Sequence, residues 1–282
     1  MIAANWTEWV SSHEWCTGGV SLIPAAPRAL NDVFWLAGEQ EIDARRLIEI
    51  VSQDPVFTIR VLRLANVAAF AAAGEVTSVQ IAVVRLGTRA VRHAVLAACF
   101  SAWAQTVNTY GPRAADEIQH AIGTACLARR LAERVRLSAD DAFVQALLHD
   151  IGKLLLLKLR PEFRRRGGPA PAPEEFSDVM IAQHADVGAT ALQFWGLPEV
   201  IREPVRWHHS PLSAGEHSQA SALVYLANRL SHRYGFGRPP AEEEDPLDLD
   251  PSATALGLPD GWLGRLDQEA LDLGMSAQHL VG

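Results

Sequence analysis

The spacing of apolar residues along the chain predicts helices. In residues 28–37 the apolar side chains recur on one helical face. In residues 55–65 they cover most of the circumference, so this helix is expected to lie centrally. The alternation of apolar and polar residues that is typical of a strand is sustained nowhere. The predicted fold class is therefore all-α.

Capping residues mark where these helices begin and end. Asp54 and Pro55 form a strong start signal, since aspartate accepts a hydrogen bond at the N-cap and proline suits the first helical position. Asp43, Thr77 or Ser78, and Ser138 are expected to act as caps, and Gly87 as a stop. The helices predicted from residue 44 onward are 44–52, 55–65, one that ends at 86, 88–105, 113–136, one after Ser138, 174–195, 199–209 with a kink at Pro204, and 219–234.

Breaks in the pattern divide the chain. The first 20 residues predict a short amphipathic helix with Trp6, Val10 and Glu14 on one stripe. A Tyr-Gly-Pro break at 110–112 separates two predicted lobes, 21–108 and 113–235. Residues 236–282 are expected to form an extension with an acidic, proline-rich linker and two short helices, 252–256 and 262–273.

Composition narrows the function classes. The chain has 282 residues, 25 basic and 33 acidic side chains and a formal net charge of −8. A global basic surface for nucleic acid is absent, so no nucleic-acid partner is expected. Three cysteines without CxxC spacing fit a reducing compartment, and neither a signal peptide nor an apolar run near ~18 residues is present. We expect a cytoplasmic protein that does not associate with a membrane.

The stretch 144–159 carries the candidate chemistry. His149 and Asp150 are adjacent within a segment that is otherwise apolar. An imidazole and a carboxylate are costly to bury without partners, so the pair requires a metal, a buried hydrogen-bond network or a helix end that reaches water. If the segment stays helical, Lys153 projects to the same side, beside the pair, as a cation suited to an anionic group.

Two sets of motifs resemble known families. Leu-Leu-His149-Asp150-Ile-Gly-Lys153 resembles the signature of the HD superfamily of metal-dependent phosphohydrolases. Gln-Asp-Pro at 53–55, Arg-Leu-Ala-Asn at 63–66 and Ala-Val-Val-Arg-Leu-Gly at 82–87 resemble the first half of the HDOD domain, a helical output module of bacterial signalling. Departures are Val67, where the family usually has serine, and the altered opening Pro-Ala-Ala-Pro at 24–27. The resemblance covers about residues 20–235 and implies two helical lobes, the second an HD-type bundle.

The resemblance also implies a ligand set. Six side chains fall where an HD fold would place metal ligands: His120, His149, Asp150, His184, His208 and His209. They would hold one or two divalent ions, either iron, manganese or zinc. Asp150 and Lys153 are the candidate catalytic residues if the protein is an enzyme. A single histidine at such a position is more often a core or surface residue, and the pair at 208–209 also fits an ordinary helix C-terminus.

Two departures argue against catalysis. Asn228 stands where active phosphohydrolases have an aspartate that closes the site, and asparagine is a weaker, neutral ligand. Ser-Pro-Leu at 210–212 follows the double histidine, and no Gly-Tyr-Pro occurs later, so cyclic-dinucleotide phosphodiesterase activity is not expected. Three functions remain open: a non-catalytic regulatory module with a metal-binding pocket and an unknown signalling partner, a phosphohydrolase acting on a nucleotide or other phosphoester, and a nucleotide-binding sensor.

Overall fold

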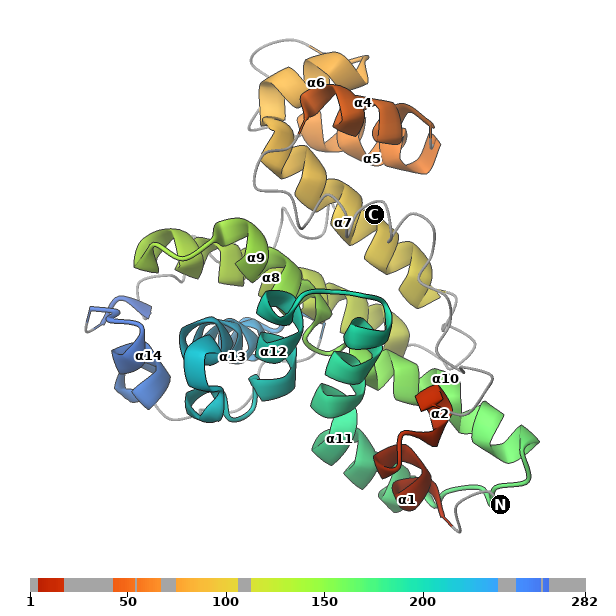
Figure 1. Cartoon of the computed structure of the whole chain (residues 1–282). Coiled ribbons are helices and arrows are strands. Elements are labelled where there is room, and N and C mark those ends of the chain that lie inside the picture. Colours follow the sequence, from red (N-terminus) through yellow and green to blue (C-terminus); the bar gives the residue numbers. More distant parts are fainter. Residues whose placement is uncertain are drawn as a thin grey trace.

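The computed structural model describes residues 5–17, 43–53, 55–66, 75–105, 113–237, 247–259 and 261–263. All regular structure in these ranges is helical, so the predicted all-α class is confirmed (Figure 1). The α-helices are α1 (Trp6–Ser11), α2 (Glu14–Thr17), α4 (Ala44–Gln53), α5 (Pro55–Ala65), α6 (Val79–Leu86), α7 (Thr88–Gln105), α8 (Arg113–Val135), α9 (Ala139–Leu148), α10 (Ile151–Arg165), α11 (Pro173–Phe194), α12 (Glu199–Trp207), α13 (Ser218–Arg233) and α14 (Pro251–Ala255).

Helices α4, α5 and α6 pack against one another and against α7. The Ser78 side chain accepts a hydrogen bond from the Ile81 N–H, and Gly87 ends α6 with a φ of 80°, as the sequence predicts. The Asn66 side chain bonds the Leu62 carbonyl and both backbone groups of Val76. Asn66 therefore ties the end of α5 to the segment that precedes α6.

Helix α7 connects this group to the rest of the molecule. Every residue from Val91 to Phe100 is buried, because one end of α7 packs on α5 and α6 while α8 and α9 pack along it. Three side chains of α7 contact a single carboxylate in the first turn of α9. Asp140 receives Arg92 Nη2 at 2.6 Å, His93 Nε2 at 3.0 Å and Arg89 Nε at 3.4 Å. The sequence pattern gave His93 no role.

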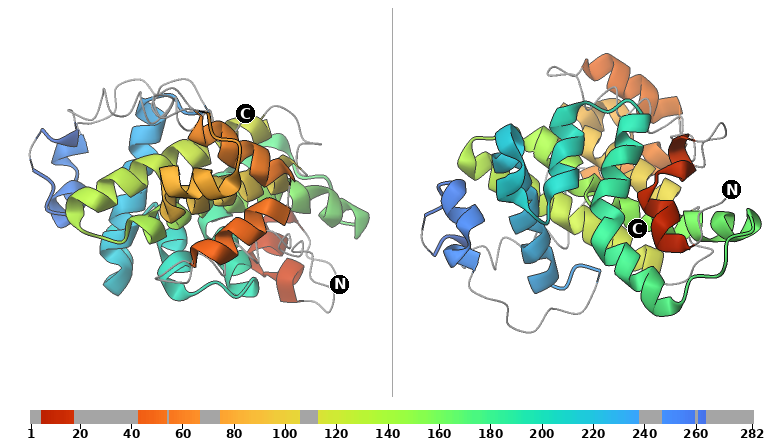
Figure 2. Two further views of the ribbon diagram at one scale, coloured as in Figure 1. Left: turned by 90° about the horizontal axis from the view of Figure 1, so that it is seen from above. Right: turned by 60° about the horizontal axis from the view of Figure 1, so that its bottom comes forward.

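The remaining helices form a bundle around α8, α9 and α13. Helix α13 packs on α8, α10 packs on α11, and α12 contacts α9, α11 and α13 (Figure 2). Ser138 caps α9 as predicted, since its hydroxyl accepts a hydrogen bond from the Asp141 N–H. Helix α12 ends at Trp207, two residues earlier than the pattern indicates.

The N-terminal segment differs from its prediction. It forms two short helices, of which α1 lies against α11, and His13 between them has a φ of 57°. Trp6 and Val10 are buried as expected, but Glu14 is exposed and does not share their stripe. The helix breaks because the chain turns to bury Trp15, whose indole N–H donates to the Val10 carbonyl at 3.0 Å.

At the other end, α14 packs on α13. Tyr225 donates a hydrogen bond to Asp250, which caps α14. The predicted cap Asp54, residues 21–42 and most of the predicted helix 262–273 lie outside the described residues, so the domain boundaries stay predictions. None of the described helices is both long and apolar enough to cross a membrane.

Candidate metal centre

The His149–Asp150 pair lies at a break between two helices. His149 is the residue after α9, and Asp150, with φ −101° and ψ 11°, precedes the first turn of α10. The segment therefore does not stay helical throughout. Lys153 still reaches the pair, because the first turn of α10 places its Nζ 2.5 Å from Asp150 Oδ2.

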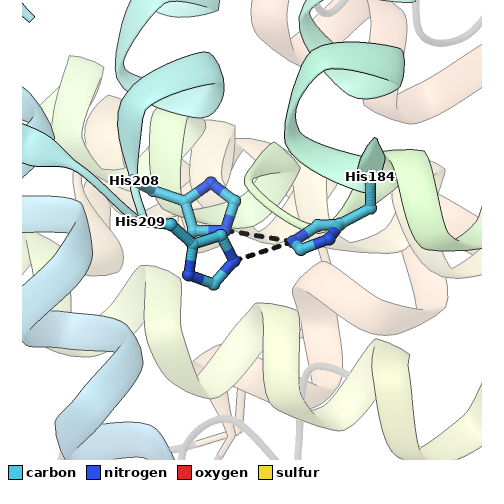
Figure 3. Close-up of side chains that lie close together, drawn as sticks. All are labelled: His184, His208 and His209. Atoms are coloured by element: carbon cyan, nitrogen blue, oxygen red, sulfur yellow. Dashed lines mark hydrogen bonds between the residues drawn. The ribbon is translucent and has the colours of Figure 1, made fainter. Parts of the chain in front are cut away.

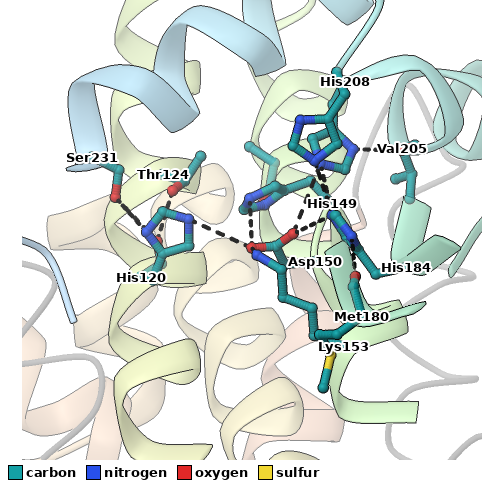
Figure 4. A network of polar contacts seen from close by, with 12 residues as sticks. His120, Thr124, His149, Asp150, Lys153, Met180, His184, Val205, His208 and Ser231 are labelled. Atoms are coloured by element: carbon teal, nitrogen blue, oxygen red, sulfur yellow. Dashed lines mark hydrogen bonds and ion pairs between the residues drawn. The ribbon is translucent and has the colours of Figure 1, made fainter. Parts of the chain in front are cut away.

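Three further imidazoles converge on Asp150 from other helices (Figure 4), and a fourth, that of His209, lies 3.0 Å from His184 Nε2. His120 comes from α8, His184 from α11, and His208 and His209 from the C-terminal end of α12. Asp150 Oδ2 lies 3.3 Å from His149 Nε2 and 3.7 Å from His120 Nε2, and Asp150 Oδ1 lies 3.1 Å from His184 Nε2 and 3.8 Å from His208 Nε2. The ligand atoms form two groups, each within 4.8 Å: His120, His149 and Asp150, and His184, His208 and His209.

Backbone carbonyls fix the tautomer of three of these rings. The Nδ1 atoms of His149, His184 and His208 each lie 2.7 Å from a carbonyl oxygen one helical turn earlier, so each Nδ1 carries the proton and donates it. The Nε2 lone pairs then point into the centre. His184 Nε2 and His208 Nε2 are only 3.3 Å apart (Figure 3). With both protons on Nδ1 no hydrogen bond joins these two nitrogens, and a cation between them would satisfy both lone pairs.

His120 is held from a different side. Its Nδ1 lies 3.1 Å from the Ser231 hydroxyl, and its ring stacks on His232 with centroids 4.5 Å apart. No role was predicted for Ser231 or for His232. Both residues lie within the predicted helix 219–234, which is α13 in the structure and packs on α8.

Burial shapes the protonation of the centre. Burial and the neighbouring His149 hold the pKa of His120 and of His208 well below the ordinary value, and burial together with His184 lowers the pKa of His209 to about 4. Burial alone would raise the pKa of Asp150, but the adjacent His149 and Lys153 outweigh it and hold that pKa well below its usual range. The low pKa values of His120, His208 and His209 favour the neutral form of these three imidazoles beside an ionised carboxylate, and metal binding requires these protonation states.

Several atoms of the centre are buried without a hydrogen-bond partner among the described residues: His120 Nε2, His149 Nε2 and Asp150 Oδ1. Buried polar atoms are rarely left unpaired, because each then keeps its full desolvation cost. Imidazole nitrogens and a carboxylate oxygen suit iron, zinc or manganese. The donor set therefore fits a divalent cation. Asn228 is also buried on α13 with its Oδ1 unpaired in the described part of the chain, and its role as a ligand stays a prediction.

Gly152 brings two of the helices together. A Cβ atom at this position would lie 1.8 Å from the His184 carbonyl oxygen and 2.8 Å from the Gly188 nitrogen. Only glycine lets α10 approach α11 this closely, and the approach sets His184 beside Asp150. The Ile-Gly-Lys segment was noted in the sequence, but the helix contact that its glycine permits was missed.

Comparisons with known proteins identify the family of the chain and its fold. The model of the HDOD domain family matches residues 23–211. A curated but uncharacterized protein of Treponema pallidum is 24% identical over an alignment of 230 residues, and the match covers 78% of this chain and 44% of that protein. The chain thus spans less than half the length of this relative.

Solved structures share the fold. An HDOD domain protein of unknown function from Geobacter sulfurreducens has a TM-score of 0.71 and 19% identity, with 97% of each chain covered. A candidate phosphohydrolase from Shewanella amazonensis has a TM-score of 0.67 and 22% identity, covering 92% of this chain and 95% of its own. A candidate signal transduction protein from Marinobacter aquaeolei has a TM-score of 0.68 and 21% identity, and all of this chain matches 62% of it. At these identities the likenesses show the fold alone.

Proposed function

The chain belongs to the HDOD domain family, and we propose that it is a regulatory output module of bacterial-type signal transduction whose buried pocket binds a divalent metal without catalysing hydrolysis. The metal would be iron, manganese or zinc, and its role would be to pin the helices of the bundle or to sense the ion. The partner would be another signalling protein, which the chain would bind in the cytoplasm.

One observation carries this proposal. Of the six converging ligand-type side chains, five are imidazoles, and the single carboxylate, Asp150, already bonds Lys153. Two-metal hydrolases stabilise both the attacking and the leaving oxygen, and anionic ligands hold their two ions together. The neutral Asn228 supplies no second charge. The pocket is therefore better suited to holding a cation than to running a two-metal hydrolysis.

Metal analysis together with a turnover screen tests the proposal. The protein is purified without a polyhistidine tag or chelator, its metal content is measured, and nucleotides and other phosphoesters are tested for phosphate release. We expect about one equivalent of metal and no release above a protein-free control. Asp150→Ala should lose the metal, because it removes the central anion, whereas Asp141→Ala in the first turn of α9 should keep it. Unchanged metal content in Asp150→Ala would reject the metal centre.

The second candidate function is a metal-dependent phosphohydrolase acting on a nucleotide or another phosphoester. It is favoured by Lys153, whose ammonium group lies beside Asp150 and would neutralise a phosphate. Some proteins of the same fold are candidate phosphohydrolases. Phosphate release that Asp150→Ala abolishes would establish this function in place of the regulatory one.

A further inference from the structure

The carboxylate of Asp150 divides the centre into two sides. Oδ1 faces His184 and His208, which with His209 form one ligand group, called here the His184 group. Oδ2 faces His120 and His149, and these two residues with Asp150 form the His120 group. Each group offers three ligand atoms, so geometry alone would permit an ion on either side.

Lys153 makes the two sides unequal. Its Nζ lies 2.5 Å from Oδ2, the same oxygen that an ion in the His120 group would require. The Lys153 side chain is only 14% exposed, so its charge is poorly screened by water. Oδ1, in contrast, is buried without a hydrogen-bond partner among the described residues. The oxygen on the side of the His184 group is the one left for a metal.

The net charge of the centre also favours one divalent ion over two. Asp150 and Lys153 together are neutral, and imidazoles that bind a metal ion carry no charge. One divalent ion would leave the centre with a net charge of +2, and two would leave +4. Like charges a few ångströms apart repel strongly in a buried site, and the described residues place no second carboxylate among the converging ligands to offset this repulsion.

We propose that Lys153 takes the place of a second metal ion, so that the centre binds a single divalent cation through the His184 group and Asp150 Oδ1. The inference rests on the metal binding proposed above. It assigns different parts to the two ligand groups: the His184 group holds the ion, and the His120 group surrounds an ion pair within the protein.

Counting metal ions in matched variants tests the inference. Tag-free apoprotein is saturated with Co²⁺, dialysed against metal-free buffer and analysed for bound cobalt. We expect one equivalent in the wild type, one in His120→Ala and none in His184→Ala. Lys153→Met should take up a second equivalent, because it frees Oδ2 and removes the competing positive charge. Lys158→Met, a change of the same kind on the same helix, should stay at one.

The outcomes separate this inference from the function proposed above. Two equivalents in the wild type, loss of the ion in His120→Ala, or a folded Lys153→Met that stays at one would overturn the role of Lys153 while leaving metal binding intact. No cobalt in the wild type would overturn both. If Lys153→Met does not fold, as circular dichroism would reveal, the comparison of His120→Ala with His184→Ala decides the question.

Discussion

At the scale of single residues, the metal centre depends on histidines that use Nδ1 in a hydrogen bond and leave Nε2 available for a metal ion. Carbonyls of the preceding turn hold the Nδ1 protons of His149, His184 and His208, which turns three Nε2 lone pairs inward. A core of apolar residues would not tolerate this arrangement without a compensating cation. The inward lone pairs therefore favour metal binding, and in the metal-free protein the same buried, unpaired atoms cost free energy.

Gly152 is the residue where packing and the centre meet. Gly152→Ala should destabilise the fold by about 2 kcal/mol, despite the better helix propensity of alanine, because the new methyl group collides with the backbone of His184. The collision should also separate His184 from Asp150 and weaken metal binding. Urea denaturation and metal titration would measure the two effects.

Gly188→Ala is the matched control for Gly152→Ala. A Cβ atom at Gly188 would lie 3.2 Å from the nearest backbone atom, which is tight without being a collision. We expect a smaller loss of stability and little change in metal affinity. Equal effects of the two substitutions would contradict the special role of Gly152.

At the scale of elements, α9 connects the α7 contact to the centre. Arg92 and His93 of α7 contact Asp140 in the first turn of α9. The last residue of α9 directly precedes His149. Arg92 is 1% exposed, and its Nη2 lies 2.6 Å from the carboxylate of Asp140. A ten-residue helix is about 15 Å long. If α9 is rigid, the contact that fixes its first turn also fixes the position of its last residue, beside His149.

Removing the charge of Asp140 should therefore lower the stability of the fold. Asp140→Asn removes the carboxylate charge that contacts the buried Arg92, and we expect a loss of about 2 kcal/mol in unfolding free energy. Asp141→Asn removes a charge from the same helical turn, where it lacks this contact with α7, and should cost under about 1 kcal/mol. Denaturant midpoints compare the two, and a loss of the same size in both would mean that the helix dipole explains the effect.

At the scale of the whole molecule, buried titrating groups make stability depend on pH. Burial lowers the pKa of His93 to about 4 despite its bond to Asp140. Burial would raise the pKa of Asp140, but the hydrogen bond from His93 and the charge of Arg92 bring it to about 2. Both groups bind fewer protons in the folded state than in the unfolded chain, so stability rises with pH.

The pH window follows from these values. The contribution of His93 is fully present above about pH 6.5, the ordinary histidine value, and is lost as the pH falls towards about 4. Denaturation of the metal-free protein at successive pH values should show the decline, and His93→Gln should reduce its slope between pH 6.5 and 4. An unchanged slope in His93→Gln would assign the pH dependence to other groups.

The sequence alone determined the helical class, most helix ends and several caps. Hydrophobic period and capping chemistry are local properties, and Ser78, Gly87 and Ser138 act within one helical turn of themselves. Only the tertiary structure decided the break at His149–Asp150, the contact of Lys153 with one oxygen of Asp150 and the approach of α10 to α11 at Gly152. These features depend on side chains from α8, α10, α11 and α12 that meet in space, and no local pattern encodes which atom faces which.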